Sequence, residues 1–193
     1  MTVKMKLYVA TGNAHKLKEI SQILPGFEIV AENPGDVEEN APDFAGNALI
    51  KVRAIAGSRR GEWCMADDSG LEVEALGGEP GVRSARYAGG HGDTAANNEL
   101  LLRNLEGVDN RAARFVCSIA LVSPDGREFS VEGSCRGRII ESAAGAQGFG
   151  YDPLFVPEGY EQTFAELSAE EKNALSHRGR ALAAARKVLK DNA

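Results

Sequence analysis

The sequence predicts an α/β fold in which helices cover the faces of a mixed central sheet. Strand-like and helix-like segments intermix along the chain without strict alternation, as they do around mixed sheets. Hydrophobic residues make up 43% and charged residues 26%, which is typical of a globular protein with a sizeable core. The chain has 193 residues and no internal repeat or low-complexity linker, so we expect one domain over residues 1–193.

Apolar periodicity and turn residues locate the individual elements. Pro25-Gly26 ends a helical pattern, and Ser123-Pro124-Asp125-Gly126 is a hairpin signal. Asp43 is a predicted helix cap, and Ser168-x-x-Glu171 is a capping box. We expect strands at 4–10, 27–31, 62–66, 71–76, 112–122 and 127–140 and at the short run LFV. We expect helices at about 14–24, 44–60 and 94–105, another that begins after Ser168, and a last one from Ser176 to about 190.

The composition argues against several classes of protein. With 28 acidic and 22 basic residues the net charge is −6, which disfavours a protein that binds nucleic-acid backbones. No apolar run approaches the ~18–20 residues of a membrane span, and the N-terminus lacks the apolar run of a secretory signal. The three cysteines have no CxxC spacing, so we expect buried reduced thiols in a cytoplasmic protein.

A candidate anion site follows the first expected strand. The segment Thr11-Gly12-Asn13-Ala14-His15-Lys16 joins a strand to a helix through a glycine turn, which gathers backbone N–H groups at the positive end of a helix dipole. Lys16 in the first turn is electrostatically unfavourable unless an anion lies there. The segment lacks the pattern GxxxxGK[ST], and an ordinary strand–helix turn with a solvated lysine is the alternative.

Two adjacent carboxylates, Asp67 and Asp68, follow the apolar run 62–66. Both cannot point into a core without compensation, because burying an unpaired charge is costly. At a strand end, one of them could hold a hard cation such as Mg²⁺ beside a water nucleophile. An exposed acidic turn that caps the next element is the alternative, and the residues alone leave both open.

Other polar and aromatic residues could complete a nucleotide site. Four cations could converge on phosphates or could each be solvated surface charges: Lys16, Lys51, Lys172 and Arg178. His177 opens the last helix, where its polar groups would meet the same cleft. The segment Gly148-Phe149-Gly150-Tyr151-Asp152-Pro153 is either a packed loop or a platform on which a purine base stacks.

Four blocks of the sequence, in family order, resemble the inosine/xanthosine triphosphate pyrophosphatases, which remove deaminated purine nucleotides from the precursor pool. The blocks are TGNAHK at 11–16, ADDSGLEVEALGGEPGVRSARYAG at 66–89, GFGYDPLF at 148–155 and EKNALSHRGRAL at 171–182. They extend over nearly the whole chain, and the second is long and specific enough to make chance similarity no serious rival.

This resemblance implies a mixed α/β fold with two lobes around a deep substrate cleft, usually in a homodimer. The implied reaction is Mg²⁺-dependent hydrolysis of ITP, dITP or XTP to the monophosphate and pyrophosphate. Asp68 would accept the proton of the water and bind the metal, with Glu39 as a second carboxylate on the metal side. The implied substrate-binding residues are Thr11, Gly12, Asn13, Ala14, His15, Lys16, Lys51, Ser69, Phe149, Gly150, Tyr151, Asp152, Lys172, His177 and Arg178.

One departure from the family pattern concerns the metal. Relatives commonly carry an acid just before Asn47, whereas this chain has Gly46, so a metal role at that position is lost or moved. Two other function classes stay open. One is a pyrophosphatase for a modified pyrimidine nucleotide, which a comparison of purine and pyrimidine substrates would distinguish. The other is a non-catalytic nucleotide-binding protein, which would leave Asp67 and Asp68 without a purpose.

Overall fold

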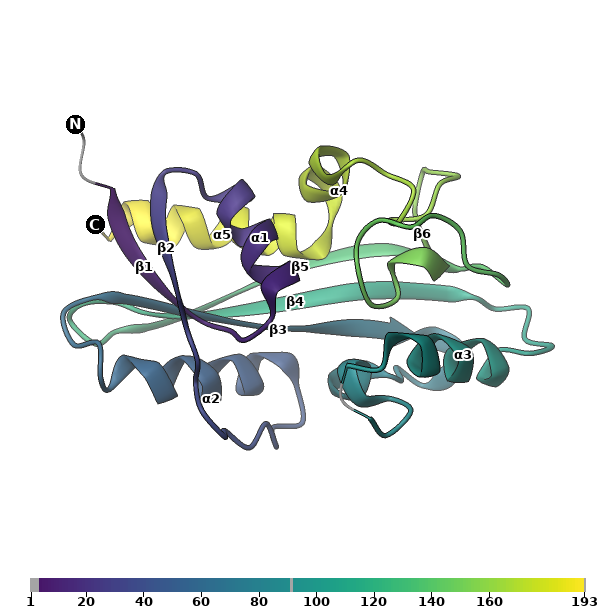
Figure 1. The fold of residues 1–193 in the computed structure, drawn as a ribbon, viewed down its shortest axis with the longest axis horizontal. Helices are drawn as coiled ribbons and strands as arrows, with labels where there is room; N and C mark the ends of the chain where they lie inside the picture. The colour runs from purple at the N-terminus through teal and green to yellow at the C-terminus, as the bar shows by residue number, and fades with distance from the viewer. Residues whose placement is uncertain (1–3, 91, 193) are drawn as a thin grey trace. The chain divides into compact units, whose positions relative to one another are not determined.

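The computed structural model describes residues 4–90 and 92–192, and Figure 1 shows the path of the chain. The described chain divides into two units, each assembled from segments that are distant in sequence. Unit 1 contains the described residues up to Asp68, then Cys117–Gly133, and those from Arg178 onward. Unit 2 contains Ser69–Val116 and Ser134–His177.

Six strands form one mixed sheet, in the order β2-β1-β3-β4-β5-β6. β1 pairs in parallel with both β2 and β3, whereas β5 and β6 pair antiparallel. The mixed sheet flanked by helices is the fold class predicted from the sequence. The strands are β1 (Met5–Ala10), β2 (Phe27–Glu32), β3 (Trp63–Val73), β4 (Ala112–Val122), β5 (Glu128–Ile139) and β6 (Phe155–Pro157).

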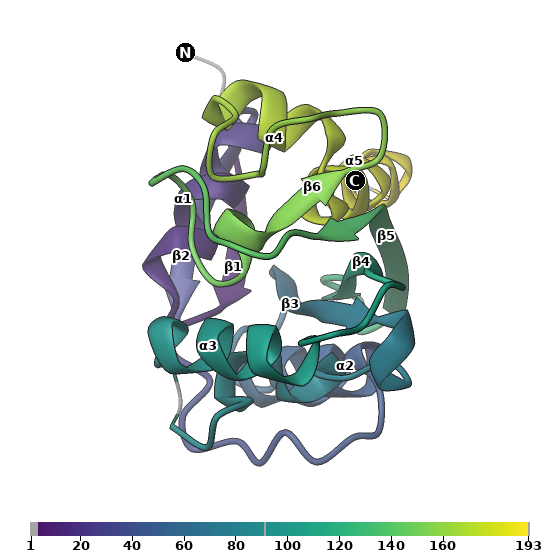
Figure 2. The ribbon, with the colours of Figure 1, turned by 90° about the vertical axis from the view of Figure 1, so that its right-hand side faces the viewer.

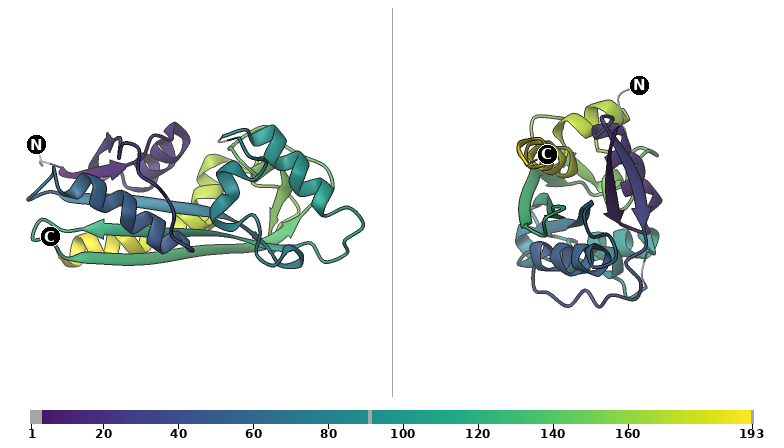
Figure 3. Two further views of the ribbon diagram at one scale, coloured as in Figure 1. Left: turned by 90° about the horizontal axis from the view of Figure 1, so that it is seen from below. Right: turned by 90° about the vertical axis from the view of Figure 1, so that its left-hand side faces the viewer.

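Unit 1 has a helix layer on each face of its strands (Figure 1; Figure 3, right). α2 (Phe44–Ala56) covers one face, and α1 (Ala14–Ile23) and α5 (His177–Asp191, which enters unit 1 at Arg178) cover the other. Strand alternation supplies both cores, because successive side chains point to opposite faces. The core on the side of α1 and α5 contains Leu7, Val9, Met65, Ile20 and Leu182, and the core on the side of α2 contains Ala10, Cys64, Ala66, Val52 and Ile55.

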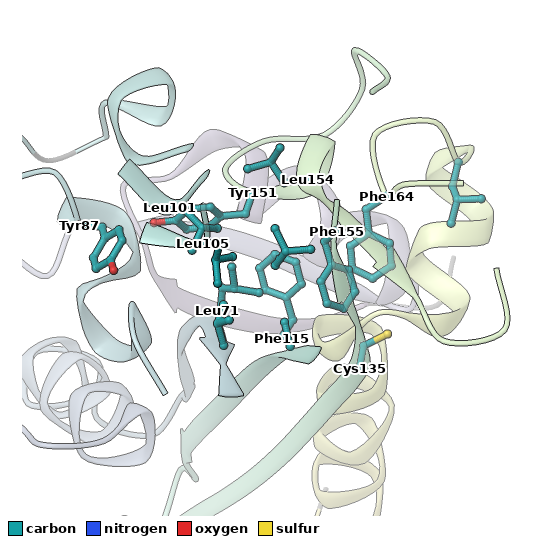
Figure 4. Close-up of a cluster of buried hydrophobic side chains, with 14 residues drawn as sticks. Leu71, Tyr87, Leu101, Leu105, Phe115, Cys135, Tyr151, Leu154, Phe155 and Phe164 are labelled. Carbon is teal, nitrogen blue, oxygen red and sulfur yellow. The ribbon is translucent and has the colours of Figure 1, made fainter. Parts of the chain in front are cut away.

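Unit 2 contains the remaining helices and its own aromatic core. Parts of β3, β4 and β5 belong to this unit. Its other elements are η1 (Glu74–Leu76), η2 (Gly81–Arg86), α3 (Thr94–Asn104), η3 (Asp152–Leu154), β6 and α4 (Ala169–Leu175), and Figure 2 shows α3, β6 and α4 from the side. Three phenylalanines pack together in the core, with the ring centroids of Phe115 and Phe155 4.8 Å apart and those of Phe155 and Phe164 5.0 Å apart (Figure 4). Leu71 of β3 and Leu101 of α3 lie in the same cluster as Phe115 of β4, so these three elements are held together by apolar contact.

The structure confirms most of the predicted elements and local signals. The Ser168–Glu171 capping box is present at the start of α4, and Asp43 caps α2 through its side chain. The three cysteines are buried free thiols, as expected. α2 ends at Ala56, short of the predicted 60, because the chain turns at Gly57 and Arg59 instead pairs with Glu32 at 2.6 Å. No helix in the described part of the chain is long and apolar enough to cross a membrane.

One prediction about the strands is wrong. Residues 62–66 and 71–76 are not two strands separated by a turn, because β3 runs without interruption from Trp63 to Val73 and η1 follows it. Asp67 and Asp68 therefore lie inside a strand, where they are 2% and 9% exposed. The exposed acidic turn that the residues left open is thereby excluded. Strand pairing tolerates these buried carboxylates because each has a cationic partner in unit 1.

Candidate active site

Asp67 and Asp68 point to opposite faces of β3, since side chains alternate along a strand. The contacts of each carboxylate follow this alternation: Asp67 contacts Lys16 on α1, whereas Asp68 contacts Lys51 on α2. A single sequence doublet therefore supplies one carboxylate to each helix layer of unit 1. This division could not be anticipated while the doublet was interpreted as the end of a strand.

The carboxylate of Asp67 collects two cations on one oxygen. Its Oδ2 lies 3.0 Å from Lys16 Nζ and accepts hydrogen bonds from Arg178 Nε at 3.4 Å and Nη2 at 3.3 Å. Arg178 Nη1 also donates to Glu19 Oε2 at 2.6 Å. The other oxygen, Asp67 Oδ1, is buried without a hydrogen-bond partner among the described residues. Burial would raise the pKa of Asp67, but Lys16 and Arg178 outweigh it and hold that pKa well below its usual range.

The carboxylate of Asp68 has a different environment. Its Oδ1 lies 3.1 Å from Lys51 Nζ, and its Oδ2 accepts a hydrogen bond from Asn47 Nδ2 at 3.3 Å. Lys51 Nζ also lies 3.1 Å from Glu39 Oε2, so one ammonium joins two carboxylates. Burial raises the pKa of Asp68 above its usual value, and the coulombic effect of Lys51 offsets only part of this shift. Asp68 is therefore the carboxylate of the doublet that accepts a proton more readily.

Lys51 stays charged in spite of its burial. Burial alone would lower its pKa, but the surrounding carboxylates, above all Asp68, raise it overall. The ammonium occupies a place between Asp68 and Glu39 in which a cation is stabilised, so these two carboxylates suit a hard metal ion. Within the described residues no three His, Cys, Asp or Glu side chains group as a metal site. A Mg²⁺ ion held here would therefore take its other ligands from water or phosphate, as this ion commonly does.

The turn at residues 11–16 joins β1 to α1 as the sequence predicted. Asn13 caps the helix, and its Oδ1 accepts hydrogen bonds from the backbone N–H of His15 at 2.9 Å and of Lys16 at 3.2 Å. Thr11 Oγ1 in turn accepts from the N–H of Asn13 at 3.1 Å. Gly12, Asn13, Ala14 and His15 are exposed. The anion that compensates Lys16 at this helix start is the carboxylate of Asp67.

Unit 2 brings a second set of predicted residues together. Lys172 Nζ lies 2.7 Å from Asp152 Oδ2, and the two side chains are 6% and 4% exposed. The same oxygen accepts the backbone N–H of Phe149 at 2.8 Å, and the Lys172 ammonium lies 5.0 Å from the centre of the Phe149 ring. Gly148, at φ +75°, leaves room for the carboxyl of Asp152, with which a Cβ would collide. The loop is thus built around a buried ion pair beside an aromatic face.

The remaining predicted residues of unit 2 have mixed positions. The ring of His177 stacks on that of Phe115, with centroids 4.6 Å apart and an interplanar angle of 11°. Tyr151 is buried in the aromatic core, where its hydroxyl donates to Ser84 O at 2.9 Å, so its ring is not an open stacking platform. Gly150 O accepts from Asn98 Nδ2 at 3.2 Å, and Ser69 is half-buried in β3. That the residue sets of the two units bind one substrate stays a prediction.

Gly46 lies at a crowded helix start. A Cβ at this position would lie 2.5 Å from Ala41 Cβ and 3.1 Å from Asp43 Oδ1. The backbone N–H of Gly46 donates to that same Asp43 oxygen at 2.7 Å, and this hydrogen bond holds Gly46 close to the Asp43 side chain. An acidic side chain at this position does not fit this conformation.

Sequence reasoning missed three residues of this site. Asn47 donates a hydrogen bond to Asp68, and its Oδ1 accepts one from the backbone N–H of Ala41 at 3.0 Å. An asparagine within a predicted helix carries no sequence signal for either contact. Glu19 binds Arg178 across α1 and α5, a contact between distant segments without a local signal. The sequence indicated no role for Asp67 separate from that of Asp68. The unfavourable charge of Lys16 in a first helical turn was the signal that could have identified Asp67 as the partner of Lys16.

The sequence and the fold are similar to those of a known family. The Ham1 family model matches residues 7–188. A dITP/XTP pyrophosphatase of Desulforamulus reducens is 52% identical over 96% of both chains, and one of Clostridium perfringens is 47% identical over 97% of this chain and 96% of the relative. The solved structure of the Staphylococcus aureus Ham1 protein matches with a TM-score of 0.87 and 38% identity over 97% of this chain and all of that one. The solved dITP/XTP pyrophosphatase of Mycobacterium abscessus matches with a TM-score of 0.75 and 50% identity over 94% of this chain and 98% of its own. The chain therefore belongs to the Ham1 family.

Proposed function

We propose that this protein hydrolyses ITP, dITP and XTP to the nucleoside monophosphate and pyrophosphate. The observation that carries the proposal is the buried carboxylate of Asp68, held by Asn47 and Lys51, in a chain about half identical to dITP/XTP pyrophosphatases. Hydrolysis between the α- and β-phosphates needs a group that accepts a proton from the attacking water, and a carboxylate of raised pKa meets that need.

In this proposal the triphosphate lies at the start of α1. Lys16 stabilises the charge that develops on the leaving pyrophosphate, and the helix dipole acts in the same direction. Lys51 holds the Asp68 carboxylate in place through its 3.1 Å contact, while Asp68 takes the proton of the water that attacks the α-phosphorus. Asn47 fixes the second oxygen of that carboxylate, so Asp68 presents one defined face to the water.

We also propose Mg²⁺ as the cofactor, held by Asp68 and Glu39. These residues fit it, because both carboxylates already share one cation, the Lys51 ammonium. When bound, Mg²⁺ would neutralise charge on the phosphates and on the leaving group. The remaining catalytic work falls to Asp68, Lys51 and Lys16.

Recognition of the base belongs to unit 2 in this proposal. A 6-oxo purine presents a hydrogen-bond acceptor where adenine presents an amino donor. Lys172 carries donors alone, so adenine would set a donor against a donor at a buried site. Phe149 supplies an aromatic face for stacking, which adds affinity with little discrimination because every base has such a face. Asp152 holds the Lys172 ammonium at 2.7 Å and so determines where its donors point.

The decisive experiment incubates the wild-type protein with ITP and Mg²⁺ and measures pyrophosphate and orthophosphate separately. Release of IMP and pyrophosphate in equal amounts, without orthophosphate, is the expected result. The assay is repeated with XTP, ATP and modified pyrimidine nucleotides. Preference for a pyrimidine would favour the related pyrophosphatase class, and binding without turnover would favour a non-catalytic protein.

The assembly and location of the protein complete the proposal. We propose a homodimer that acts in the cytoplasm on free nucleotides and that needs no nucleic acid or membrane. The resemblance to nucleotide-pool pyrophosphatases supports this, as does the net charge of −6, which disfavours nucleic-acid backbones. Sedimentation equilibrium of the purified protein tests the dimer.

A further inference from the structure

The contact between Lys16 and Asp67 has no place in the proposed chemical steps, yet it is closely built. The Lys16 side chain is 15% exposed and that of Asp67 is 1% exposed, so the carboxylate lies on the protein side of the ammonium. Within the described chain, Asp67 is the only carboxylate at ion-pair distance from Lys16. The position of this ammonium is therefore set by one buried residue.

The second cation on Asp67 does not depend on it in the same way. Arg178 donates to Asp67 at 3.3 Å and 3.4 Å, but it also donates to Glu19 at the shorter distance of 2.6 Å. Removal of the Asp67 charge would thus leave Arg178 with a counter-ion and Lys16 with none. A lysine side chain that loses its one partner is free to move toward solvent, since it has several rotatable bonds.

Resting on the proposed function, we propose that Asp67 is a positioning residue that fixes Lys16 for the chemical step and thereby weakens phosphate binding in the resting site. A carboxylate 3.0 Å from the ammonium repels an incoming phosphate and competes for the same donor. The fixed ammonium, however, needs no reorganisation when charge develops on the leaving group. Binding energy withheld from the ground state and realised in the transition state raises kcat.

A purely structural ion pair is the alternative, and it makes a different prediction for turnover. If the Asp67–Lys16 pair only stabilised unit 1, its loss would reduce the fraction of folded protein, while kcat per folded molecule would stay close to that of the wild type. Removing the Asp67 charge favours anion binding in either account. A lower kcat per folded molecule together with tighter pyrophosphate binding, both dependent on Lys16, therefore separates the two accounts.

The experiment compares the wild type with Asp67→Asn, Lys16→Met and the double variant. Inorganic pyrophosphate binding is measured by calorimetry at a fixed Mg²⁺ concentration. The stoichiometry gives the fraction of folded protein, and the Kd gives the affinity of the folded protein for pyrophosphate. In Asp67→Asn we expect pyrophosphate to bind about tenfold more tightly while kcat for ITP falls by about a hundredfold. In the double variant the gain in affinity should disappear, and kcat should be no lower than in Lys16→Met.

Matched variants keep the outcome unambiguous. Glu32→Gln breaks another ion pair of unit 1, Arg59–Glu32 at 2.6 Å, and should change neither kcat nor pyrophosphate affinity. If Asp67→Asn does not fold, Asp67→Glu keeps the charge but displaces the ammonium, so kcat should fall with pyrophosphate affinity unchanged. Weaker pyrophosphate binding in Asp67→Asn, or full kcat in either Asp67 variant, overturns the proposal. Absence of ITP hydrolysis by the wild type would instead overturn the proposed function, and the pyrophosphate titrations would still report on Lys16.

Discussion

Asp67 and Asp68 have the same side chain and adjacent positions, yet their pKa values move in opposite directions. Two cations hold the pKa of Asp67 low, whereas burial raises that of Asp68 despite its contact with Lys51. Sites that separate the pKa values of neighbouring carboxyl groups often assign them different roles. At the scale of single residues, this difference in pKa distinguishes Asp68, the proposed base, from Asp67.

Asp68→Asn should nearly abolish ITP hydrolysis while the protein remains folded. The amide has the shape of the carboxyl group but does not accept the proton, and its uncharged oxygen binds a cation more weakly. Loss of a general base costs about 10²–10⁴ in rate. The check is kcat for ITP, together with the thermal unfolding curve. Asp125→Asn, in the exposed β4–β5 turn, is the matched control and should keep full activity. A folded Asp68→Asn protein with near-normal kcat would contradict the assignment.

Lys172→Met should narrow the preference for ITP over ATP. In the proposed function the ammonium supplies donors for a 6-oxo group. An unpaired buried polar group costs about 1–3 kcal/mol, which corresponds to roughly five- to 150-fold in selectivity. The measurement is kcat/KM for ITP and ATP in the wild type and the variant. Phe149→Leu is the comparison, since loss of stacking should lower both values alike. An unchanged ITP-to-ATP ratio in Lys172→Met would place base recognition elsewhere.

At the scale of elements, the start of α2 shows how one helix positions two parts of the site. Asp43 caps the helix through the N–H of Gly46, and one and two turns onward Asn47 and Lys51 reach Asp68. Because Asn47 and Lys51 are four residues apart, they lie on the same helix face. The helix start therefore determines where both contacts to the carboxylate lie.

Gly46→Glu should destabilise the protein even though an acid suits a first helical turn. Its Cβ would meet Ala41 Cβ at 2.5 Å, and overpacking of this kind costs about 1–3 kcal/mol. The thermal unfolding midpoint is the measurement. Adding Ala41→Gly removes the opposing Cβ and should restore most of the loss. If Gly46→Glu alone leaves the midpoint unchanged, the segment before α2 shifts more easily than this packing implies.

Local signals in the sequence predicted most of the helices and strands, whereas the contacts between distant elements could not be predicted from it. The cap of α2, the capping box of α4 and the β4–β5 turn are determined by neighbouring residues, so their patterns were sufficient. β3 was divided in error because Asp-Asp-Ser-Gly has turn chemistry, and what keeps it in a strand is the set of distant cations at Lys16, Lys51 and Arg178. Glu19 and Asn47 were missed for the same reason, since their partners lie far along the chain.

At the scale of the whole molecule, the buried thiols link the fold to pH. Burial raises the pKa of Cys117 to about 12, while a thiol in an unfolded chain has a pKa of about 8.5. The unfolded state thus releases this proton first as the pH rises. The contribution to stability is complete below the unfolded pKa and is lost progressively between about pH 8.5 and 12.

The free energy of unfolding should therefore fall as the pH rises above about 8.5, and Cys117→Ala should make that fall less steep. Urea unfolding at a series of pH values gives the slope. As an independent check, a thiol reagent at pH near 8 should leave the native protein unmodified and label all three cysteines once it is unfolded, because every one is buried. Rapid labelling of the native protein would show that these thiols are accessible.

Because β3 is uninterrupted, the face to which each aspartate points depends on whether its position in the strand is odd or even. A strand presents alternate residues to alternate faces, so inserting one residue between Ala66 and Asp67 would exchange the carboxylates: the first would face Lys51 and the second Lys16. With an uncharged residue inserted, every charged side chain of the protein would be retained, yet each acid would face the helix that the other faces now. Inserting two residues would restore the original facing at the cost of a longer strand. The facing of the two acids thus depends on whether the number of inserted residues is odd or even. A chain that keeps every functional side chain can still lose the contacts of Asp67 with Lys16 and of Asp68 with Lys51.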